Sequence, residues 1–517
     1  MKKYLLFLLV VTILLSGFSN LKKEKEQEQE QKPNFLVIIT DDQTYDAVNA
    51  LGNKEISTPN IDKLVDEGVN FSHCFNQGSW AGAVCIASRT MLITGQTIYK
   101  APKNYTYLIS SMNKKKKKKK IDTNKHTQVE LWPEVFSKAG YQTFLTGKWH
   151  NSDYAALKAF NKASAIGHGM YESRDSTGAK VQYNRPSEKN NTWSPSDVAF
   201  TGHWTPMVKD IIYTEGDTAK IGKEYTVNKH TSELYADKAI DFINSDVKDS
   251  DDPFFMYVAF NAPHDPRQSP KEYVDMYPVE EIKIPANYLP EHPFDQGDHT
   301  VRDEKLAPFP RTHEAVKTHL SEYYAIITHA DHEIGRILEA LEKSGKMDNT
   351  YVIFTSDHGL AMGKHGLFGK QNQYDHSVRM PLVIAGPGIE KGRKVDNMVY
   401  MQSIYATTCQ LAGIEVPKTV EFPSIAQLVT GKSDQGGEDV IYGSYKNKQR
   451  MVRTDEYKLI YYPHIKKTQL FDIVNDPLEM VDLSENNEYA EVLVDMKSKL
   501  SSKRKGLGDF MLNKKNK

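Results

Sequence analysis

Polar and charged side chains follow four short apolar segments of this 517-residue chain. Asp41-Asp42 follows one segment, Asp357-His358 follows another, and Lys148, His150 and His264 follow the remaining two. Three aspartates and a histidine offer mostly oxygen ligands, which suit a hard divalent cation such as Ca²⁺ or Mg²⁺. A divalent cation beside lysine and histidine side chains is a site for an anionic group such as sulfate or phosphate.

One cysteine lies where its sulfur could take part in chemistry. Cys85 precedes Arg89 by four residues in the segment AVCIASRTMLITG, residues 83–95. If a helix begins near Cys85, the helix N-terminus and the Arg89 guanidinium would both stabilise negative charge there. The alternative is a buried structural thiol, which we expect for Cys74 and Cys409. Three cysteines exclude a disulfide scaffold and a four-cysteine zinc site.

Strands and helices must bring these residues together, and the apolar pattern predicts where those elements lie. Short β-branched and aromatic runs predict strands at residues 34–40, 141–146, 254–260, 351–356 and 381–385. Amphipathic stretches predict helices from Thr58-Pro59 onward and at residues 129–139, 232–244 and 314–344. This alternation predicts an α/β fold with a large mixed, mostly parallel sheet sandwiched by helices. Because ligands bind at the carboxyl ends of strands in such sheets, the four polar groups are expected at one edge.

The pattern changes after Gly436-Gly437. Four short runs, at residues 440–445, 451–454, 458–462 and 469–472, predict antiparallel strands, and residues 489–500 predict a final helix. We therefore expect a catalytic domain at residues 34–437. A small C-terminal α+β subdomain that contains an antiparallel sheet would follow at residues 438–512.

The first residues are typical of an export signal. Residues 1–19 contain two lysines, an apolar run too short to span a bilayer, and small residues after it. The charged residues 20–33 predict a disordered tether. Leu15-Ser16-Gly17 resembles a bacterial lipoprotein box, but Phe18 stands where that box needs cysteine. We expect an exported protein, periplasmic or extracellular, with cell-surface association left open and no transmembrane span.

The charge balance argues against nucleic acid as a partner. The chain has 66 basic and 67 acidic residues, which gives a net charge of −1 and lacks the excess of basic residues typical of nucleic-acid-binding proteins. Lys114–Lys120 is a run of lysines. It reads either as a polyanion-binding patch or, more simply, as a solvated surface insertion, because like charges repel and resist packing. The sequence does not indicate an oligomeric state.

Several of these motifs resemble those of the type I, formylglycine-dependent sulfatase family of the alkaline-phosphatase-like superfamily. Residues 85–89 (CIASR) resemble the C-x-P-S-R signature, with Ala87 in place of proline. Residues 140–150 (GYQTFLTGKWH) are similar to the second signature, and Asp41-Asp42 to the N-terminal metal pair. Residues 356–370 resemble the second metal motif and its downstream lysine, with His358 as in the iduronate-2-sulfatase-like and choline-sulfatase-like branches. The resemblance extends from about residue 34 to about residue 483.

The resemblance implies a role for each site residue. A sulfatase-maturing enzyme would oxidise Cys85 to formylglycine, whose hydrate is the nucleophile. The metal ligands would be Asp41, Asp42, Asp357, His358 and the modified Cys85, and the ion would be Ca²⁺, with Mg²⁺ as the alternative. Arg89 would hold the hydrate, and Lys148 and Lys370 would contact the sulfate oxygens. His264 would be the acid for the leaving alcohol, alone or with Lys370, and His150 would be the base for sulfate release.

The function expected from these features is hydrolysis of a sulfate ester on a sulfated carbohydrate. Aryl sulfate and choline sulfate are the alternative substrates for the same chemistry. A phosphoryl hydrolase of the same superfamily is a second class, and Cys85 with one carboxylate-rich site argues against it. A protein that binds sulfated glycans without turnover is a third class, which applies if Cys85 is not matured.

Some residues near these motifs have simpler explanations. His329 and His332 lie three positions apart on a predicted helix, where packing or surface roles are favoured over metal binding. His365 is either structural or an indirect support for the metal motif. Asp265 and Arg267 would contact substrate hydroxyls or form the turn around the proline between them.

Overall fold

The computed structural model describes residues 31–103, 129–168, 202–214 and 218–509. The predicted signal, most of the tether and Lys114–Lys120 lie outside the described residues. The chain divides into a unit Met1–Pro33 and a compact unit from Asn34 onward, and only the second carries the elements below. Among the described residues, no helix combines the length and apolar character needed to cross a membrane.

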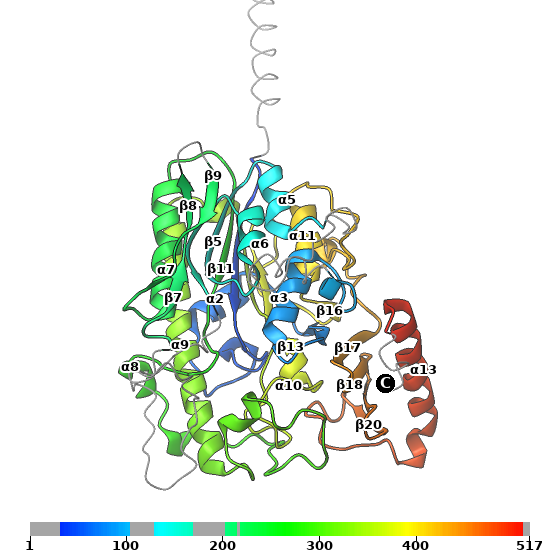
Figure 1. Ribbon diagram of the computed structural model, residues 1–517. Helices are drawn as coiled ribbons and strands as arrows, with labels where there is room; N and C mark the ends of the chain where they lie inside the picture. The colour runs from blue at the N-terminus through cyan, green and yellow to red at the C-terminus, as the bar shows by residue number, and fades with distance from the viewer. Residues whose placement is uncertain (1–30, 104–128, 169–201, 215–217, 510–517) are drawn as a thin grey trace, which may run out of the picture. The chain divides into compact units, whose positions relative to one another are not determined.

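A mixed sheet forms the centre of the second unit (Figure 1). Its strand order in the described residues is β10-β7-β6-β5-β11-β1-β12-β14-β2-β15. The strands are β1 (Asn34–Thr40), β2 (Val69–Phe71), β5 (Gln142–Lys148), β6 (Lys162–Gly167), β7 (Met207–Lys209), β10 (Tyr225–Thr226), β11 (Phe254–Ala259), β12 (Thr350–Ser356), β14 (Leu382–Ala385) and β15 (Arg393–Val395). The neighbours β5, β11, β1 and β12 are all parallel, whereas β14 runs antiparallel to β12. The predicted mixed, mostly parallel sheet is confirmed.

Strand β1 explains why this sheet is covered on both faces. All seven of its residues are buried, as a near-continuous apolar run requires in a parallel sheet. Phe35, Val37 and Ile39 pack into one hydrophobic cluster, while Leu36 and Ile38 pack into another on the opposite face. The alternation of side chains along a strand therefore supplies two cores from one segment.

Helices supply the other half of each core (Figure 1). Helices α2 (Pro59–Glu67), α7 (Thr231–Phe242) and α9 (His313–Lys343) contribute to the cluster that contains Leu36. Helices α3 (Val84–Thr94), α5 (Trp132–Lys138), α6 (Asp153–Ala159) and α11 (Ser403–Leu411) contribute to the cluster that contains Phe35. The helix expected at residues 129–139 begins only at Trp132, because Leu131 is extended and a proline occupies the first turn.

A second sheet contains the predicted antiparallel strands and one strand that we did not predict. Its order in the described residues is β20-β19-β18-β17-β4. The members are β4 (Gly78–Ser79), β17 (Ile441–Tyr445), β18 (Gln449–Arg453), β19 (Tyr457–Tyr462) and β20 (Lys467–Asp472), and helix α13 (Ala490–Leu507) packs on β18 and β19. Strand β4 comes from the N-terminal half of the chain and pairs in parallel with β17. The boundary between residues 437 and 438 stays a prediction.

The remaining elements are short. The short strands are β3 (Cys74–Phe75), β8 (Ile211–Thr214), β9 (Thr218–Ile221), β13 (Arg379–Met380) and β16 (Val399–Tyr400), and the short α-helices are α8 (Lys271–Val274), α10 (Asp375–Val378) and α12 (Ala426–Val429). Single turns lie at Asn49–Leu51, Ile243–Val247, Val279–Glu281, Asp303–Leu306, Met347–Asn349 and Asn487–Tyr489. Cys74 and Cys409 are buried free thiols, as predicted.

Candidate active site

Four neighbouring parallel strands deliver the predicted site residues to one edge of the central sheet. Lys148 ends β5, His264 follows β11, Asp41-Asp42 follows β1, and Asp357-His358 follows β12. Because these strands are parallel neighbours, their carboxyl ends meet at the same edge. The backbone continues the strand pairing here, since the N–H of Asp41 donates to the carbonyl of Ala262 at 3.0 Å.

The cysteine reaches this edge from a helix. Cys85 is the second residue of α3, and β4 anchors the chain a few residues before it. Arg89 lies one turn further along the same helix face. Cys85 is 2% exposed and Arg89 is fully buried, so both side chains point into the protein.

Carboxylates, His358 and the Cys85 sulfur converge on one point. The Nε2 atom of His358 lies 3.1 Å from the Cys85 sulfur, 3.2 Å from Asp42 Oδ1 and 3.5 Å from Asp357 Oδ1. Asp41, Cys85, Asp357 and His358 each place one ligand atom within 4.8 Å of the others. Asp42, Cys85 and His264 form a second such group. Asp41 Oδ1 is buried without a hydrogen-bond partner in the described part of the chain, as a ligand atom for a cation would be.

Two buried lysines balance the carboxylates. The ammonium of Lys148 forms an ion pair with Asp41. The ammonium of Lys370 donates to both oxygens of Asp42, at 2.7 and 2.8 Å, and lies 3.4 Å from the Cys85 sulfur. Burial alone would lower the pKa of Lys370, but Asp42 and Cys85 raise it well above its usual value. The site therefore holds permanent positive charge beside its carboxylates.

Arg89 orients Asp357. Its Nε atom donates to Asp357 Oδ2 at 2.9 Å, and its Nη1 atom donates to the carbonyl of Lys148 at 2.7 Å. Burial would raise the pKa of Asp357, but His358 and Arg89 hold it below its usual value. Asp357 is therefore ionised and fixed in orientation. The Nη2 atom of Arg89 has no hydrogen-bond partner among the described residues.

Helix α3 begins at Val84, beside Cys85, as the expectation for this cysteine required, but burial dominates the protonation of the thiol. Burial, and then Asp41, raise the pKa of the Cys85 thiol well above its usual value, although Lys148 and Lys370 act in the opposite direction. The Arg89 guanidinium forms its ion pair with Asp357, and the Cys85 sulfur is a weaker electrostatic neighbour. The thiol is therefore neutral and a weak nucleophile in this environment.

His264 lies beside the carboxylate pair. Its Nδ1 atom is 2.7 Å from the backbone carbonyl of Asp265, and since a carbonyl only accepts, Nδ1 carries the proton. Its Nε2 atom faces the site, 3.8 Å from Asp42 Oδ2. The imidazole of His203 donates to the backbone carbonyl of His264 at 3.1 Å and so supports the loop.

His150 follows β5 by two residues. Its backbone is left-handed, with φ of 55°. Burial and the neighbouring Lys148 lower the pKa of His150 well below its usual value, so its imidazole is neutral. Its Nδ1 atom lacks a hydrogen-bond partner within the described ranges. The proposed role of His150 as a base stays a prediction.

The residues near the motifs for which the sequence favoured or allowed a structural role pack against other parts of the protein. His365 stacks on Tyr374 with ring centroids 4.1 Å apart. His329 packs between His230 and Tyr273, in line with the packing role favoured from the sequence. Arg267 is fully buried and donates to His319 at 3.0 Å.

Sequence reasoning missed several supporting residues. Asn76 and Ser88 both donate to the backbone carbonyl of Asp357 at 2.7 Å. The hydroxyl of Tyr323, on α9, donates to the backbone carbonyl of Asp42 at 2.7 Å. Ser88 lies inside the segment that resembles the C-x-P-S-R signature, and this position could have identified it from the sequence. Asn76 and Tyr323 act through contacts distant in sequence, which no local pattern reveals.

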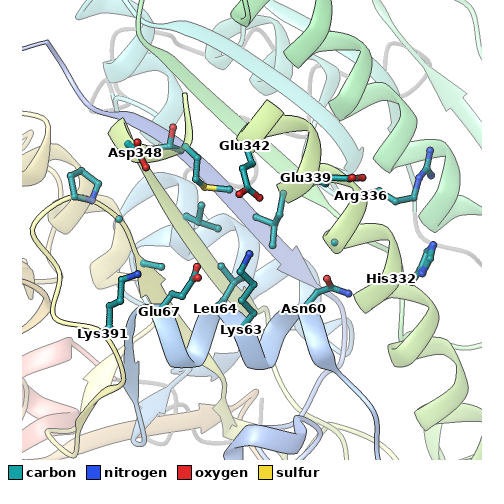
Figure 2. A pocket seen from close by; sticks show the side chains of 18 residues that line it. Asn60, Lys63, Leu64, Glu67, His332, Arg336, Glu339, Glu342, Asp348 and Lys391 are labelled. Atoms are coloured by element: carbon teal, nitrogen blue, oxygen red, sulfur yellow. The ribbon is translucent and has the colours of Figure 1, made fainter. Parts of the chain in front are cut away.

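A separate groove lies between α2 and α9 (Figure 2). Its volume is about 530 Å³, with Leu64, Leu338 and Val352 among its apolar lining residues and Lys63 and Arg336 among its charged ones. None of the predicted site residues lines it.

Known proteins resemble the chain over most of its length. Residues 33–414 match the family model described as Sulfatase, and residues 363–506 match the one described as N-sulphoglucosamine sulphohydrolase, C-terminal. An arylsulfatase of Clostridium perfringens (strain 13 / Type A) is 29% identical over 89% of this chain and 92% of that protein. An N-acetylglucosamine-6-O-sulfatase of Bacteroides thetaiotaomicron is 24% identical over 94% of this chain and 88% of that protein. The fold resembles a solved structure in complex with its substrate D-glucosamine-2-N,6-O-disulfate, with a TM-score of 0.69 at 21% identity, over 94% of this chain and 100% of that one.

Proposed function

The chain belongs to the sulfatase family, and we propose that it releases sulfate from a sulfated carbohydrate through a formylglycine derived from Cys85 and one divalent cation. One observation carries this proposal. The Cys85 sulfur lies 3.1 Å from His358 and 3.4 Å from Lys370, inside a cluster of buried carboxylates. A residue formed from this cysteine would contact both the cation ligands and the groups that bind an anion.

The cation would be held by oxygen-rich ligands. These would be Asp41, Asp42, Asp357 and His358, together with the modified Cys85. Several carboxylate oxygens favour Ca²⁺, which accepts many oxygen ligands, over Mg²⁺, which keeps several of its waters. When bound, the cation would polarise the sulfate oxygens and lower the pKa of a nearby hydroxyl.

The oxidised form of Cys85 would supply the nucleophile. An aldehyde hydrate carries two hydroxyls, of which one can attack sulfur and the other can expel sulfate as the aldehyde re-forms. The neutral, buried thiol offers no comparable route, because a sulfated thiol lacks a second hydroxyl to release the product. A sulfatase-maturing enzyme is therefore the partner that this proposal requires.

The surrounding side chains would bind the anion and move protons. Arg89, fixed by Asp357, would hold the hydrate, and Lys148 and Lys370 would contact the sulfate oxygens. His264, alone or with Lys370, would protonate the leaving oxygen, and its Nε2 is the nitrogen that faces the site. His150 would take the proton of the second hydroxyl, since its imidazole is neutral.

The substrate class rests on the relatives. One is named as a sulfatase of N-acetylglucosamine, and a structure of similar fold holds a disulfated glucosamine. The arylsulfatase relative keeps aryl sulfates as the alternative. Choline sulfate as a substrate stays a prediction. The assignment to the iduronate-2-sulfatase-like or choline-sulfatase-like branch also stays a prediction. Binding of sulfated glycans without turnover would apply if Cys85 stayed a thiol.

The location of the protein is also proposed from the sequence. Residues 1–19 support export to the periplasm or beyond the cell, where sulfated polysaccharides would be met.

The mass of one tryptic peptide tests the proposal. Residues Leu64 to Arg89 form a fragment that contains both Cys74 and Cys85. After co-expression with a sulfatase-maturing enzyme, we expect a formylglycine mass at Cys85 and an unmodified Cys74, which serves as the internal control. Sulfate release is then measured on sulfated glucosamine, nitrophenyl sulfate and choline sulfate. An unmodified Cys85 with every maturing enzyme, together with retained glycan binding, would instead support the binding protein.

A further inference from the structure

A bridge of charged side chains borders the site next to His264. Arg302 precedes the turn Asp303–Leu306 and donates to two carboxylates. Its Nη2 atom donates to Asp265 Oδ1 at 3.1 Å and to Asp303 Oδ1 at 2.5 Å, and its Nη1 atom donates to Asp265 Oδ2. The planar guanidinium has several donors in a fixed arrangement, so it sets the positions of both carboxylates relative to each other.

Each of these carboxylates adjoins one of the two candidate proton donors. Asp265 Oδ1 lies 3.4 Å from His264 Nδ1. Asp303 Oδ2 lies 4.0 Å from the ammonium of Lys370. His264 and Lys370 come from loops that follow different strands, β11 and β12, and the bridge connects the two loops.

A second contact strengthens the end of the bridge near Lys370. The side-chain amide of Gln371 donates to Asp303 Oδ2 at 2.7 Å and also to the carbonyl of Gly82 at 3.1 Å. Gly82 lies three residues before Cys85. The bridge therefore also touches the loop that begins the nucleophile helix.

The bridge is costly unless it is complete. Asp265 and Asp303 are 4% and 5% exposed, and a buried carboxylate without a partner is strongly unfavourable. Arg302 is their shared cation, whereas its own side chain is 39% exposed. Removal of Arg302 would take away the cation that Asp265 and Asp303 share, so their mutual repulsion would move the loops that carry His264 and Lys370 apart.

We propose that Arg302 is a positioning residue that holds His264 and Lys370 in one arrangement around the oxygen of the departing alcohol. The inference rests on the proposed function, because it assumes that these two side chains serve the leaving group. Arg302 acts through Asp265 and Asp303 and does not touch the sulfate. Its loss would therefore reduce turnover most for substrates whose leaving oxygen needs a proton.

The test compares two substrates and two variants. The variant Arg302→Gln removes the positive charge of the guanidinium and its several N–H donors. Lys305→Gln, the matched control, removes one positive charge from the same turn, at an exposed lysine. We expect Arg302→Gln to lower kcat on sulfated glucosamine about 10- to 100-fold more than kcat on nitrophenyl sulfate, since small misplacements of catalytic groups have effects of this size. KM should stay within about twofold, and Lys305→Gln should match the wild type.

Three results would overturn the proposal. Equal losses on both substrates would show a general structural role, and a raised KM with unchanged kcat would show direct substrate binding. Activity equal to that of Lys305→Gln would show no role. If Arg302→Gln fails to fold, Asp303→Asn breaks the bridge at the Lys370 end and must show the same substrate dependence.

Failure of the proposed function is distinguishable from failure of this inference. If the wild type lacks formylglycine and releases no sulfate, the function is wrong. If the wild type is active and His264→Ala shows dependence on the leaving group, while Arg302→Gln does not, only the inference is wrong.

Discussion

Substitution of His264 should reduce activity to a degree that depends on the leaving group of the substrate. The variant His264→Ala removes an imidazole that is fully buried and has its Nε2 atom 3.8 Å from Asp42 Oδ2. The proposed role of this nitrogen is to give a proton to the leaving oxygen. An alcohol of a sugar leaves poorly without that proton, whereas a nitrophenolate leaves well as an anion. The loss of activity should therefore depend on the substrate.

The structure sets the expected size of the effect. General acids contribute about 10²–10⁴-fold to rate. Burial and Lys370 lower the pKa of His264 well below its usual value, and Nδ1 already carries the neutral proton, so Nε2 must gain a second one before it can donate. Because the neutral imidazole must first gain this proton, we expect the contribution of His264 to lie near the lower end of that range of about 10²–10⁴-fold. We expect a loss of about 100-fold on sulfated glucosamine and less than about tenfold on nitrophenyl sulfate.

The assay measures kcat for both substrates with enzyme of known formylglycine content. His150→Ala is the matched control, because its proposed proton transfer follows departure of the alcohol. The loss in His150→Ala should therefore be similar for both substrates. Equal losses on both substrates in His264→Ala would refute the acid role of His264 and leave Lys370, which is protonated at rest, as the acid.

Two further predictions concern the cation and the C-terminal sheet. Treatment with a chelator should abolish sulfate release, and added Ca²⁺ should restore it, whereas restoration by Mg²⁺ alone would contradict the proposed ion. Glu479 is buried near Lys458, and burial outweighs that cation and raises the pKa of Glu479 to about 7 from 4.5. Because the folded protein keeps a proton that the unfolded chain releases, the free energy of unfolding should fall as pH rises from about 4.5 to about 7. Glu479→Gln should show a smaller fall in urea unfolding over that pH range, and an unchanged slope would contradict the assignment.

Much of the sheet edge was predictable because its signal is local. Strand β1 is a buried apolar run that ends at a pair of aspartates, and β12 ends in the same way at Asp357-His358. The rule that ligands bind at the carboxyl ends of parallel strands then places these groups together without any knowledge of long-range contacts.

Other features depend on contacts that leave no local pattern. Strand β4 has two residues, too few for any periodicity, and its partner β17 lies more than 300 positions later. The bridge from Asp265 through Arg302 to Asp303 likewise joins segments distant in sequence. The ion pair of Arg89 with Asp357 also leaves no local pattern, because the two residues lie 268 positions apart in the sequence.

The charges of the site also bear on which ester it accepts. Asp41, Asp42 and Asp357 carry three negative charges, and Arg89, Lys148 and Lys370 carry three positive ones. Buried charges are stable only when they are paired, and this set is balanced, as are the adjoining carboxylates Asp265 and Asp303 with Arg267 and Arg302. A divalent cation would add two positive charges. The single charge of a sulfate ester and one ionised hydroxyl would balance these, whereas a doubly charged phosphate monoester would leave an unpaired negative charge in a buried site. Under the proposed mechanism, the charge balance therefore favours a singly charged ester over a phosphate monoester.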